Sequence, residues 1–112
     1  MTTTPSYYII AYDLHDSDKN YNDVTEHIKR LGESKHILYS TWIVKTEKKI
    51  QDIFTLVRPA FDQNDNVFIA RIGIGSCKEI LPSEFSRWIK VQKVKPAILE
   101  AIKSPTLRRR VH

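Results

Sequence analysis

The chain is poor in cysteine and has no long apolar run. Its single cysteine, Cys77, excludes a disulfide within the 112 residues, which favours a reducing, cytoplasmic location and a role as a small, semi-buried filler. No apolar run approaches the roughly 20 residues that span a bilayer. The first residues, Met1 to Pro5, lack the basic and apolar regions of a secretion signal. Internal repeats are also absent, so we expect a single cytoplasmic domain with no membrane partner.

Acidic residues are scarce in the last quarter of the chain. The whole chain carries a net charge of +5, but residues 85–112 contain eight basic residues and one acid, Glu100. The basic residues are Arg87, Lys90, Lys93, Lys95, Lys103, Arg108, Arg109 and Arg110. A basic tail suggests a polyanionic partner such as nucleic acid, because Lys and Arg displace counterions from phosphates. A solubilising terminus explains the same charge, so both interpretations stay open.

The remaining sequence has four segments with strand character and two with helical spacing. Apolar and β-branched residues predict strands over 7–13 and 67–72, while the run 36–45 predicts two strands with a tight turn near Ser40. Helical spacing is found in Tyr21, Val24, Ile28 and Leu31 before Gly32, and in Ile50, Ile53, Phe54 and Val57 before Pro59. The order β-α-β-β-α-β predicts a ferredoxin-like α+β fold, with two helices on one face of an antiparallel sheet.

The glycines Gly73 and Gly75 mark a break after the last strand. We assign residues 1–77 to the ferredoxin-like core and residues 78–112 to a basic C-terminal extension of the same domain. Pro82-Ser83-Glu84 predicts the start of a short helix with Phe85, Trp88 and Ile89, and a last amphipathic turn or helix carries Ile98, Leu99 and Ile102. The extension could cover a sheet edge or exchange with a partner chain.

Asp13 ends the first predicted strand. A carboxylate at the end of a sheet can bind a divalent metal ion, since hard cations prefer oxygen ligands. A strand-end acid that hydrogen-bonds the following loop is the alternative interpretation. His15 could act as a general base or contact phosphate, although a solvated loop histidine is the favoured interpretation. The other histidines, His27, His36 and His112, show no metal-ligand spacing.

Three further patterns have simpler structural interpretations. Asp16-x-Asp18-x-Asn20 resembles the start of a calcium loop but lacks the required glycine and glutamate, which predicts a solvated loop. Trp42 and Phe68 could stack on bases, but core packing is favoured for both. Ser40 could contact phosphate, although satisfying a kinked backbone is the favoured role.

Short motifs over residues 7–73 resemble a known family. They are the Tyr-Asp-Leu end of the first strand, the Leu-Gly end of the first helix, the Ser-Thr-Trp step and the Asn-Asp-Asn-Val-Phe-Ile strand. Together they resemble the small CRISPR-associated nuclease-like family called Cas two. The match is closer to its SinR-like relatives and more distant from the VapD-type ribonucleases.

The resemblance implies a homodimeric, metal-dependent endonuclease that cleaves RNA or DNA. In that family the acid at the end of the first strand binds Mg²⁺ or Mn²⁺ together with the same acid of a second protomer, and a metal-activated water attacks the phosphodiester. Asp13 alone matches that catalytic and metal-binding position. The chain departs from active relatives after this acid, where arginines are replaced by residues 15–18, and after the serine-containing strand, where an acid is replaced by Val44-Lys45.

These departures leave two other functions open. The first is a catalytically inactive, nuclease-like dimer that serves as a platform for nucleic acid or for protein. Its expected nucleic-acid contacts are Lys93, Lys95, Arg108, Arg109 and Arg110. The second is a module that recruits another protein through a sheet edge or its C-terminal helices, with the positive charge incidental.

Overall fold

The computed structural model describes residues 4–15 and 21–103, and the side chains of those residues up to 94. The chain divides into two compact units, Met1–Gly73 and a second unit that begins at Ile74. Each unit is described by itself.

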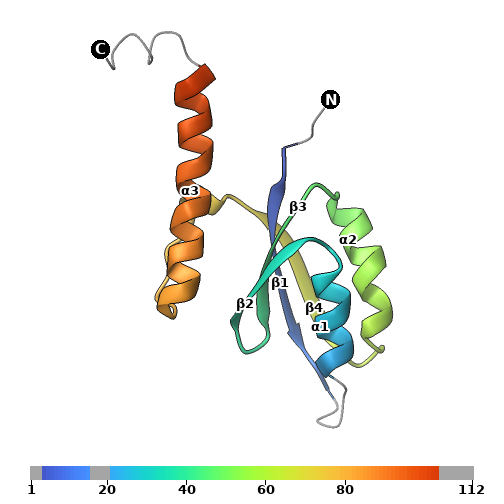
Figure 1. The fold of residues 1–112 in the computed structure, drawn as a ribbon. Coiled ribbons are helices and arrows are strands. Elements are labelled where there is room, and N and C mark those ends of the chain that lie inside the picture. Colours follow the sequence, from blue (N-terminus) through green and yellow to red (C-terminus); the bar gives the residue numbers. More distant parts are fainter. Residues whose placement is uncertain (1–3, 16–20, 104–112) are drawn as a thin grey trace, which may run out of the picture. The chain divides into compact units, whose positions relative to one another are not determined.

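The first unit has the predicted β-α-β-β-α-β order (Figure 1). Its elements are β1 (Ser6–Asp13), α1 (Tyr21–Lys29), β2 (Glu33–Leu38), β3 (Thr41–Thr46), α2 (Ile50–Val57), a short 3₁₀ turn (Arg58–Ala60) and β4 (Asn66–Ile72). The strands form one antiparallel sheet in the order β2-β3-β1-β4. This confirms the predicted α+β class and ferredoxin-like plan.

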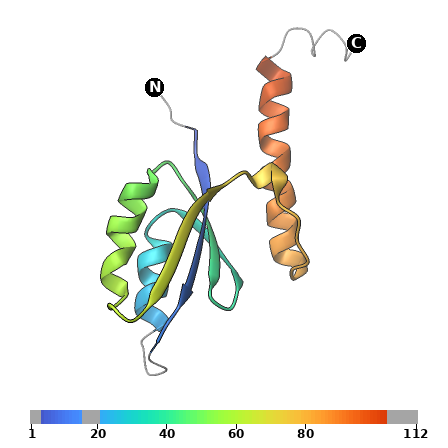
Figure 2. The same cartoon turned by 180° about the vertical axis from the view of Figure 1, so that it is seen from behind.

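Both helices of this unit cover the same face of the sheet (Figures 1 and 2). Strand alternation sends Tyr8, Ile10 and Tyr12 of β1 towards them, and all three are buried. The apolar faces of the helices meet these residues through Val24, Ile28, Ile53 and Val57, none of which is exposed to solvent. Burying each such side chain stabilises the fold by about 1.5–3 kcal/mol.

The strand pair β2–β3 confirms the predicted turn and corrects one boundary. The turn lies at Tyr39-Ser40, but β2 begins at Glu33, before the predicted start at residue 36. Glu33 and Lys35 are weak strand formers, so local sequence gives no strand signal there. Pairing with β3 overrides this preference, because Glu33 lies opposite Lys45 and Lys35 opposite Ile43 in the ladder.

The opposite side of the sheet, which we call the back face, carries apolar and polar residues. They are Tyr7, Ile9, Ala11 and Asp13 of β1, Glu33 and Lys35 of β2, Thr41, Ile43 and Lys45 of β3, and Asn66, Phe68, Ala70 and Ile72 of β4. An antiparallel sheet with one solvated face normally carries polar residues there. The apolar residues that β1 and β4 place on the back face therefore suggest an interaction surface.

Of the two strand aromatics for which core packing was favoured, one fulfils the prediction and the other does not. Trp42 is buried against the helices, but the Phe68 side chain is 64% exposed. The ladder places Val67 and Ile69 opposite Tyr12 and Ile10, on the side that faces the helices. Phe68, between them, consequently lies on the back face. The core interpretation of Phe68 was wrong.

The second unit contains a 3₁₀ turn (Ile74–Ser76) and α3 (Ser83–Lys103). The predicted start at Pro82-Ser83 is confirmed, since the Pro82 carbonyl accepts hydrogen bonds from the amides of Phe85 and Ser86. The predicted division into a short helix and a separate last turn is wrong, because α3 is continuous. Four lysines and two alanines among residues 90–103 favour a helix, and α3 continues through Pro96, which has no backbone N–H to donate. Within the described residues, no helix has the length and apolar character to cross a bilayer.

Candidate functional site

Asp13 lies at the C-terminal end of β1, with its side chain exposed. The buried residues Tyr8, Ile10 and Tyr12 fix the register of the strand, so Asp13 follows the opposite alternation onto the back face. Across the ladder it pairs with Asn66, the first residue of β4. The fold therefore positions a carboxylate beside an amide where two neighbouring strands meet the loops.

Asp13 and Asn66 line a shallow depression of about 390 Å³ at this end of the sheet. Its lining residues are Ala11, Tyr12, Asp13, Asn66, Val67 and Phe68. The depression thus combines a carboxylate, an amide and the exposed ring of Phe68. The sequence patterns did not identify Asn66 as a site residue, because they predict that the last strand begins one residue later, at Val67. The signal that could have identified Asn66 was its place at the start of the strand that the ferredoxin-like order sets beside the first strand.

The turn before β4 ties the two strand ends together. The Asp65 carboxylate accepts hydrogen bonds from the backbone amides of His15 and Asp62, both at 2.9 Å. The Asp62 carboxylate in turn accepts one from the Asn64 amide at 3.0 Å. These contacts hold His15, two residues past the end of β1, against the turn that leads into Asn66. They also occupy the carboxylates of Asp62 and Asp65 with structural roles.

A tyrosine pair contributes to the electrostatics around Asp13. The rings of Tyr21 and Tyr39 meet edge to face, with 6.1 Å between their centroids. Partial burial raises the pKa of the Tyr21 phenol, and so do its interactions with Tyr39, Tyr12 and the Asp13 carboxylate. Asp13 is therefore close enough to Tyr21 for its negative charge to disfavour ionisation of the Tyr21 phenol.

The donor chemistry at Asp13 fits a hard divalent cation, but with one carboxylate per chain. A carboxylate and an amide oxygen are the ligand types that Mg²⁺ and Mn²⁺ prefer. In the part of the chain that the structure describes, no three His, Cys, Asp or Glu side chains gather into a metal-binding group. A second carboxylate would have to come from another copy of the chain.

The other predicted site residues are distributed as follows. His15 is exposed, and its backbone amide is the donor to Asp65. The Ser40 carbonyl accepts a hydrogen bond from the Tyr12 amide at 3.0 Å, which ties the turn to β1. The acidic positions Asp16 and Asp18 lie outside the described residues.

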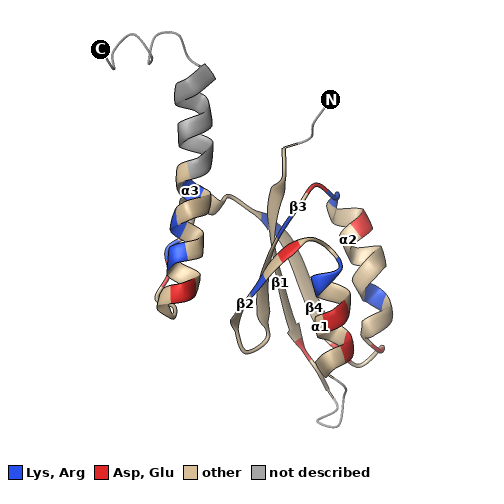
Figure 3. Ribbon diagram, viewed as in Figure 1, with Lys and Arg blue, Asp and Glu red and all other residues tan. Residues whose placement is uncertain are grey.

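The predicted nucleic-acid contacts lie in the second unit. Lys93 donates a hydrogen bond from Nζ to the Cys77 carbonyl at 2.8 Å, and both residues are half-buried, as predicted for Cys77. The side chain of Lys95 is not described, and Arg108, Arg109 and Arg110 lie outside the described residues. Arg87 and Lys90, which were counted only in the basic tail, are exposed residues of α3. Their spacing of three residues places them on one side of the helix. Figure 3 shows the Lys and Arg positions of this helix up to residue 94 in blue.

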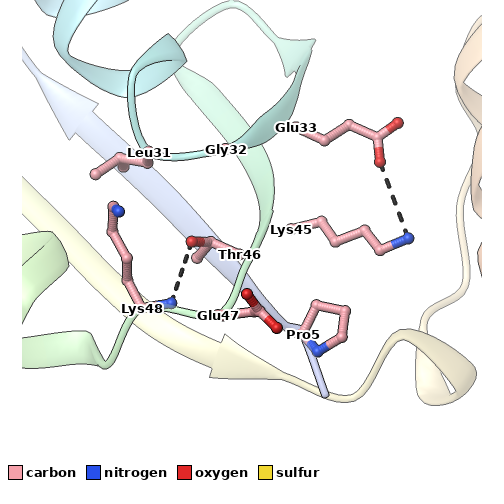
Figure 4. A pocket seen from close by; sticks show the side chains of 8 residues that line it. All are labelled: Pro5, Leu31, Gly32, Glu33, Lys45, Thr46, Glu47 and Lys48. Carbon is pink, nitrogen blue, oxygen red and sulfur yellow. Dashed lines mark hydrogen bonds and ion pairs between the residues drawn. The ribbon is translucent and has the colours of Figure 1, made fainter. Parts of the chain in front are cut away.

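A second depression, of about 460 Å³, lies at the opposite end of the sheet (Figure 4). It is lined by Pro5, Leu31, Gly32, Glu33, Lys45, Thr46, Glu47 and Lys48. Lys45 and Glu33 approach to 4.0 Å, and the Lys48 amide donates to Thr46 Oγ1 at 3.2 Å. These interactions stabilise the start of the sheet. The depression holds the carboxylates of Glu33 and Glu47 beside Lys45 and Lys48, but its lining includes no aromatic ring.

Comparison with known proteins gives the fold but no family. No protein-family model and no curated protein matches the sequence. The crystal structure of a hypothetical protein, TT1823 from Thermus thermophilus, is similar, with a TM-score of 0.53 and 20% sequence identity. The match covers 70% of this chain and 95% of that chain. At this identity the likeness shows the fold alone, so the resemblance to the Cas two family stays a prediction.

Proposed function

We propose that this protein is a Cas-two-like homodimeric endonuclease that hydrolyses RNA or DNA phosphodiesters with Mg²⁺ or Mn²⁺, in a cytoplasmic setting. The observation that carries this proposal is the position of Asp13. Its exposed carboxylate shares the back face with half-buried apolar residues such as Ile9 and Ala70. A surface that favours self-association thus lies on the same side of the sheet as the candidate metal ligand.

The dimer completes the site. A two-fold interface uses the same patch on both subunits, so two back faces that pack with their Asp13 ends together bring two carboxylates to one place. The Asn66 amide beside each carboxylate offers a further oxygen ligand and a hydrogen-bond donor for substrate. A divalent ion bound there would neutralise phosphate charge and lower the pKa of a bound water. Asp13 holds the ion, while the apolar back face limits access of bulk water.

Cleavage assays with a matched acid control test the catalytic part. Purified protein is incubated with single-stranded and duplex RNA and DNA, with Mg²⁺, Mn²⁺ or a chelator. We expect metal-dependent cleavage that Asp13→Asn reduces to background. Glu47→Gln should leave cleavage unchanged, because Glu47 is an exposed acid at the opposite end of the sheet. No cleavage of any substrate with either metal would reject the enzyme.

The mass in solution tests the assembly. Wild-type protein is expected to have twice the chain mass in light scattering. Ala70→Arg places a charge on the back face, within the edge strand β4, and it should give a monomer that no longer cleaves. A folded wild-type monomer, or an Ala70→Arg variant that stays dimeric, would contradict packing through the back face.

The second candidate function is a dimer that binds nucleic acid without cleaving it. The exposed pair Arg87 and Lys90 favours this alternative, because both cations lie on one side of α3. Arg87→Ala combined with Lys90→Ala should weaken binding and reduce the dependence of log Kd on log salt concentration by about two. Removal of residues 104–112, which contain three arginines, should reduce it by about three. Unchanged salt dependence in both variants would exclude this binding surface.

A further inference from the structure

The exposed ring of Phe68 lies in the same depression as Asp13. Single exposed apolar side chains are common on protein surfaces and need no explanation by themselves. Phe68 lines that depression together with the polar side chains of Asp13 and Asn66, and it lines a second one with Ile50 and Phe54 of α2. The ring thus belongs to the candidate site.

The ladder sets the separation between the ring and the carboxylate. Asp13 lies opposite Asn66 and Ala11 opposite Phe68, so Phe68 is the diagonal neighbour of Asp13 on the same face. Diagonal neighbours in an antiparallel pair are about 7–8 Å apart. One nucleotide covers such a span between its phosphate group and the face of its base.

The three side chains together suit one class of ligand. An aromatic ring offers a stacking surface to any base, and an amide can both donate to and accept from the polar edge of a base. A phosphate of the same nucleotide would reach the metal ion that Asp13 is proposed to hold. A purely apolar ligand would leave the Asn66 amide and the Asp13 carboxylate without partners.

We propose that Phe68 stacks on an unpaired nucleobase next to the phosphate that is cleaved, and that the substrate is therefore single-stranded nucleic acid. This inference rests on the proposed function and requires that the dimer contact leaves Phe68, near the start of the edge strand β4, open to solvent. Bases inside a duplex are already stacked on both faces, so the ring can reach them only where the strand is unpaired. Phe68 is accordingly a positioning and specificity residue, while Asp13 acts on the phosphate.

Binding measurements without cleavage test this inference separately from catalysis. Full-length Asp13→Asn protein is titrated, with the metal chelated, against a single-stranded oligonucleotide that carries a fluorescent purine analogue, and against its duplex. Stacking quenches the analogue, so quenching should occur with the single strand alone. Phe68→Ala should raise the Kd for the single strand by about 5- to 150-fold.

A set of substitutions separates stacking from simple apolar contact. Phe68→Trp should retain both affinity and quenching, because it keeps an aromatic face. Phe68→Leu keeps apolar area without that face, and it should behave like Phe68→Ala. Leu56→Ala, which removes an exposed apolar side chain of α2 outside the depression, should bind like the parent protein.

Three results would overturn the inference. They are equal binding of single strand and duplex, full affinity in Phe68→Leu, and conversion of a dimer to a monomer by Phe68→Ala, which would make the ring an interface residue. Phe68-dependent quenching in a protein that never cleaves nucleic acid would leave the stacking role intact and reject the proposed nuclease. Cleavage that depends on Asp13 but not on Phe68 would support the proposed nuclease and reject the stacking role.

Discussion

The indole nitrogen of Trp42 donates a hydrogen bond to the hydroxyl of Tyr12, with 3.2 Å between the two atoms, inside the core. Both residues are buried, and their strands are neighbours in the sheet. On its other side the Trp42 ring stacks on the His36 ring, at 4.3 Å between centroids. The indole N–H of Trp42 on β3 thus has a buried partner in the hydroxyl of Tyr12 on β1. Tyr12 is the residue immediately before Asp13.

This pairing predicts the effect of removing a single oxygen atom. Tyr12→Phe leaves the buried indole N–H without its partner, which costs about 1–3 kcal/mol of unfolding free energy. Urea denaturation followed by circular dichroism measures the loss. In a Trp42→Phe background the same substitution should cost clearly less, because no indole N–H is left unpaired. Equal costs in both backgrounds would show that the hydrogen bond contributes nothing.

Gly32 is required by a close approach of two backbone segments. A Cβ at this position would lie 2.5 Å from the Lys45 carbonyl oxygen and 3.2 Å from the Thr46 Cβ (Figure 4). Gly32→Ala therefore forces the connection between α1 and β2 away from β3. We expect it to lower the free energy of unfolding by about 1–3 kcal/mol in urea denaturation.

Gly75 provides the matched control for this prediction. A Cβ at Gly75 meets no atom within 4 Å, so Gly75→Ala should leave stability nearly unchanged. The crowding argument fails if the two alanine variants have the same stability.

The raised pKa of Tyr21 predicts a pH dependence that reports on Asp13. Burial and then the neighbours Tyr39, Tyr12 and Asp13 favour the protonated phenol in the folded protein. The folded chain thus binds this proton more tightly than the unfolded chain, whose tyrosine pKa is about 10. The resulting stabilisation is present below that pH and is lost as pH rises through the folded pKa.

Absorbance titration of tyrosinate in the folded protein measures this effect. Tyr21→Phe should remove the late-titrating phenol from the curve. Asp13→Asn should move that phenol to lower pH, since it removes one negative charge from the neighbourhood. A curve that is identical in Asp13→Asn and wild type would mean that the carboxylate does not act on Tyr21.

Much of the fold could be predicted from local patterns. The apolar and β-branched run of β1 and the helical spacing of Val24 and Ile28 carry their own signals, because both patterns are visible in the sequence. The start of β2 carries no such signal, since Glu33 joins the sheet only through its ladder with Lys45. The continuity of α3 was likewise not apparent from apolar spacing alone.

The candidate site shows the same division between local and tertiary information. Asp13 could be identified at the end of a strand from sequence alone, whereas its neighbours could not. Asn66 lies 53 positions away in the chain and becomes its partner only through the pairing of β1 with β4. A strand-end acid can be recognised locally, but the composition of a site across two strands depends on sheet order.

The sequence by itself determined which segments form strands, where the helices begin and which strand ends in a carboxylate. These properties follow from short-range periodicity and from the preferences of single residues. Only the tertiary structure decided which side of each strand the helices cover. A strand with apolar residues on both sides offers two possible core faces until packing covers one of them. That choice buried Trp42 and left Phe68 exposed beside Asp13.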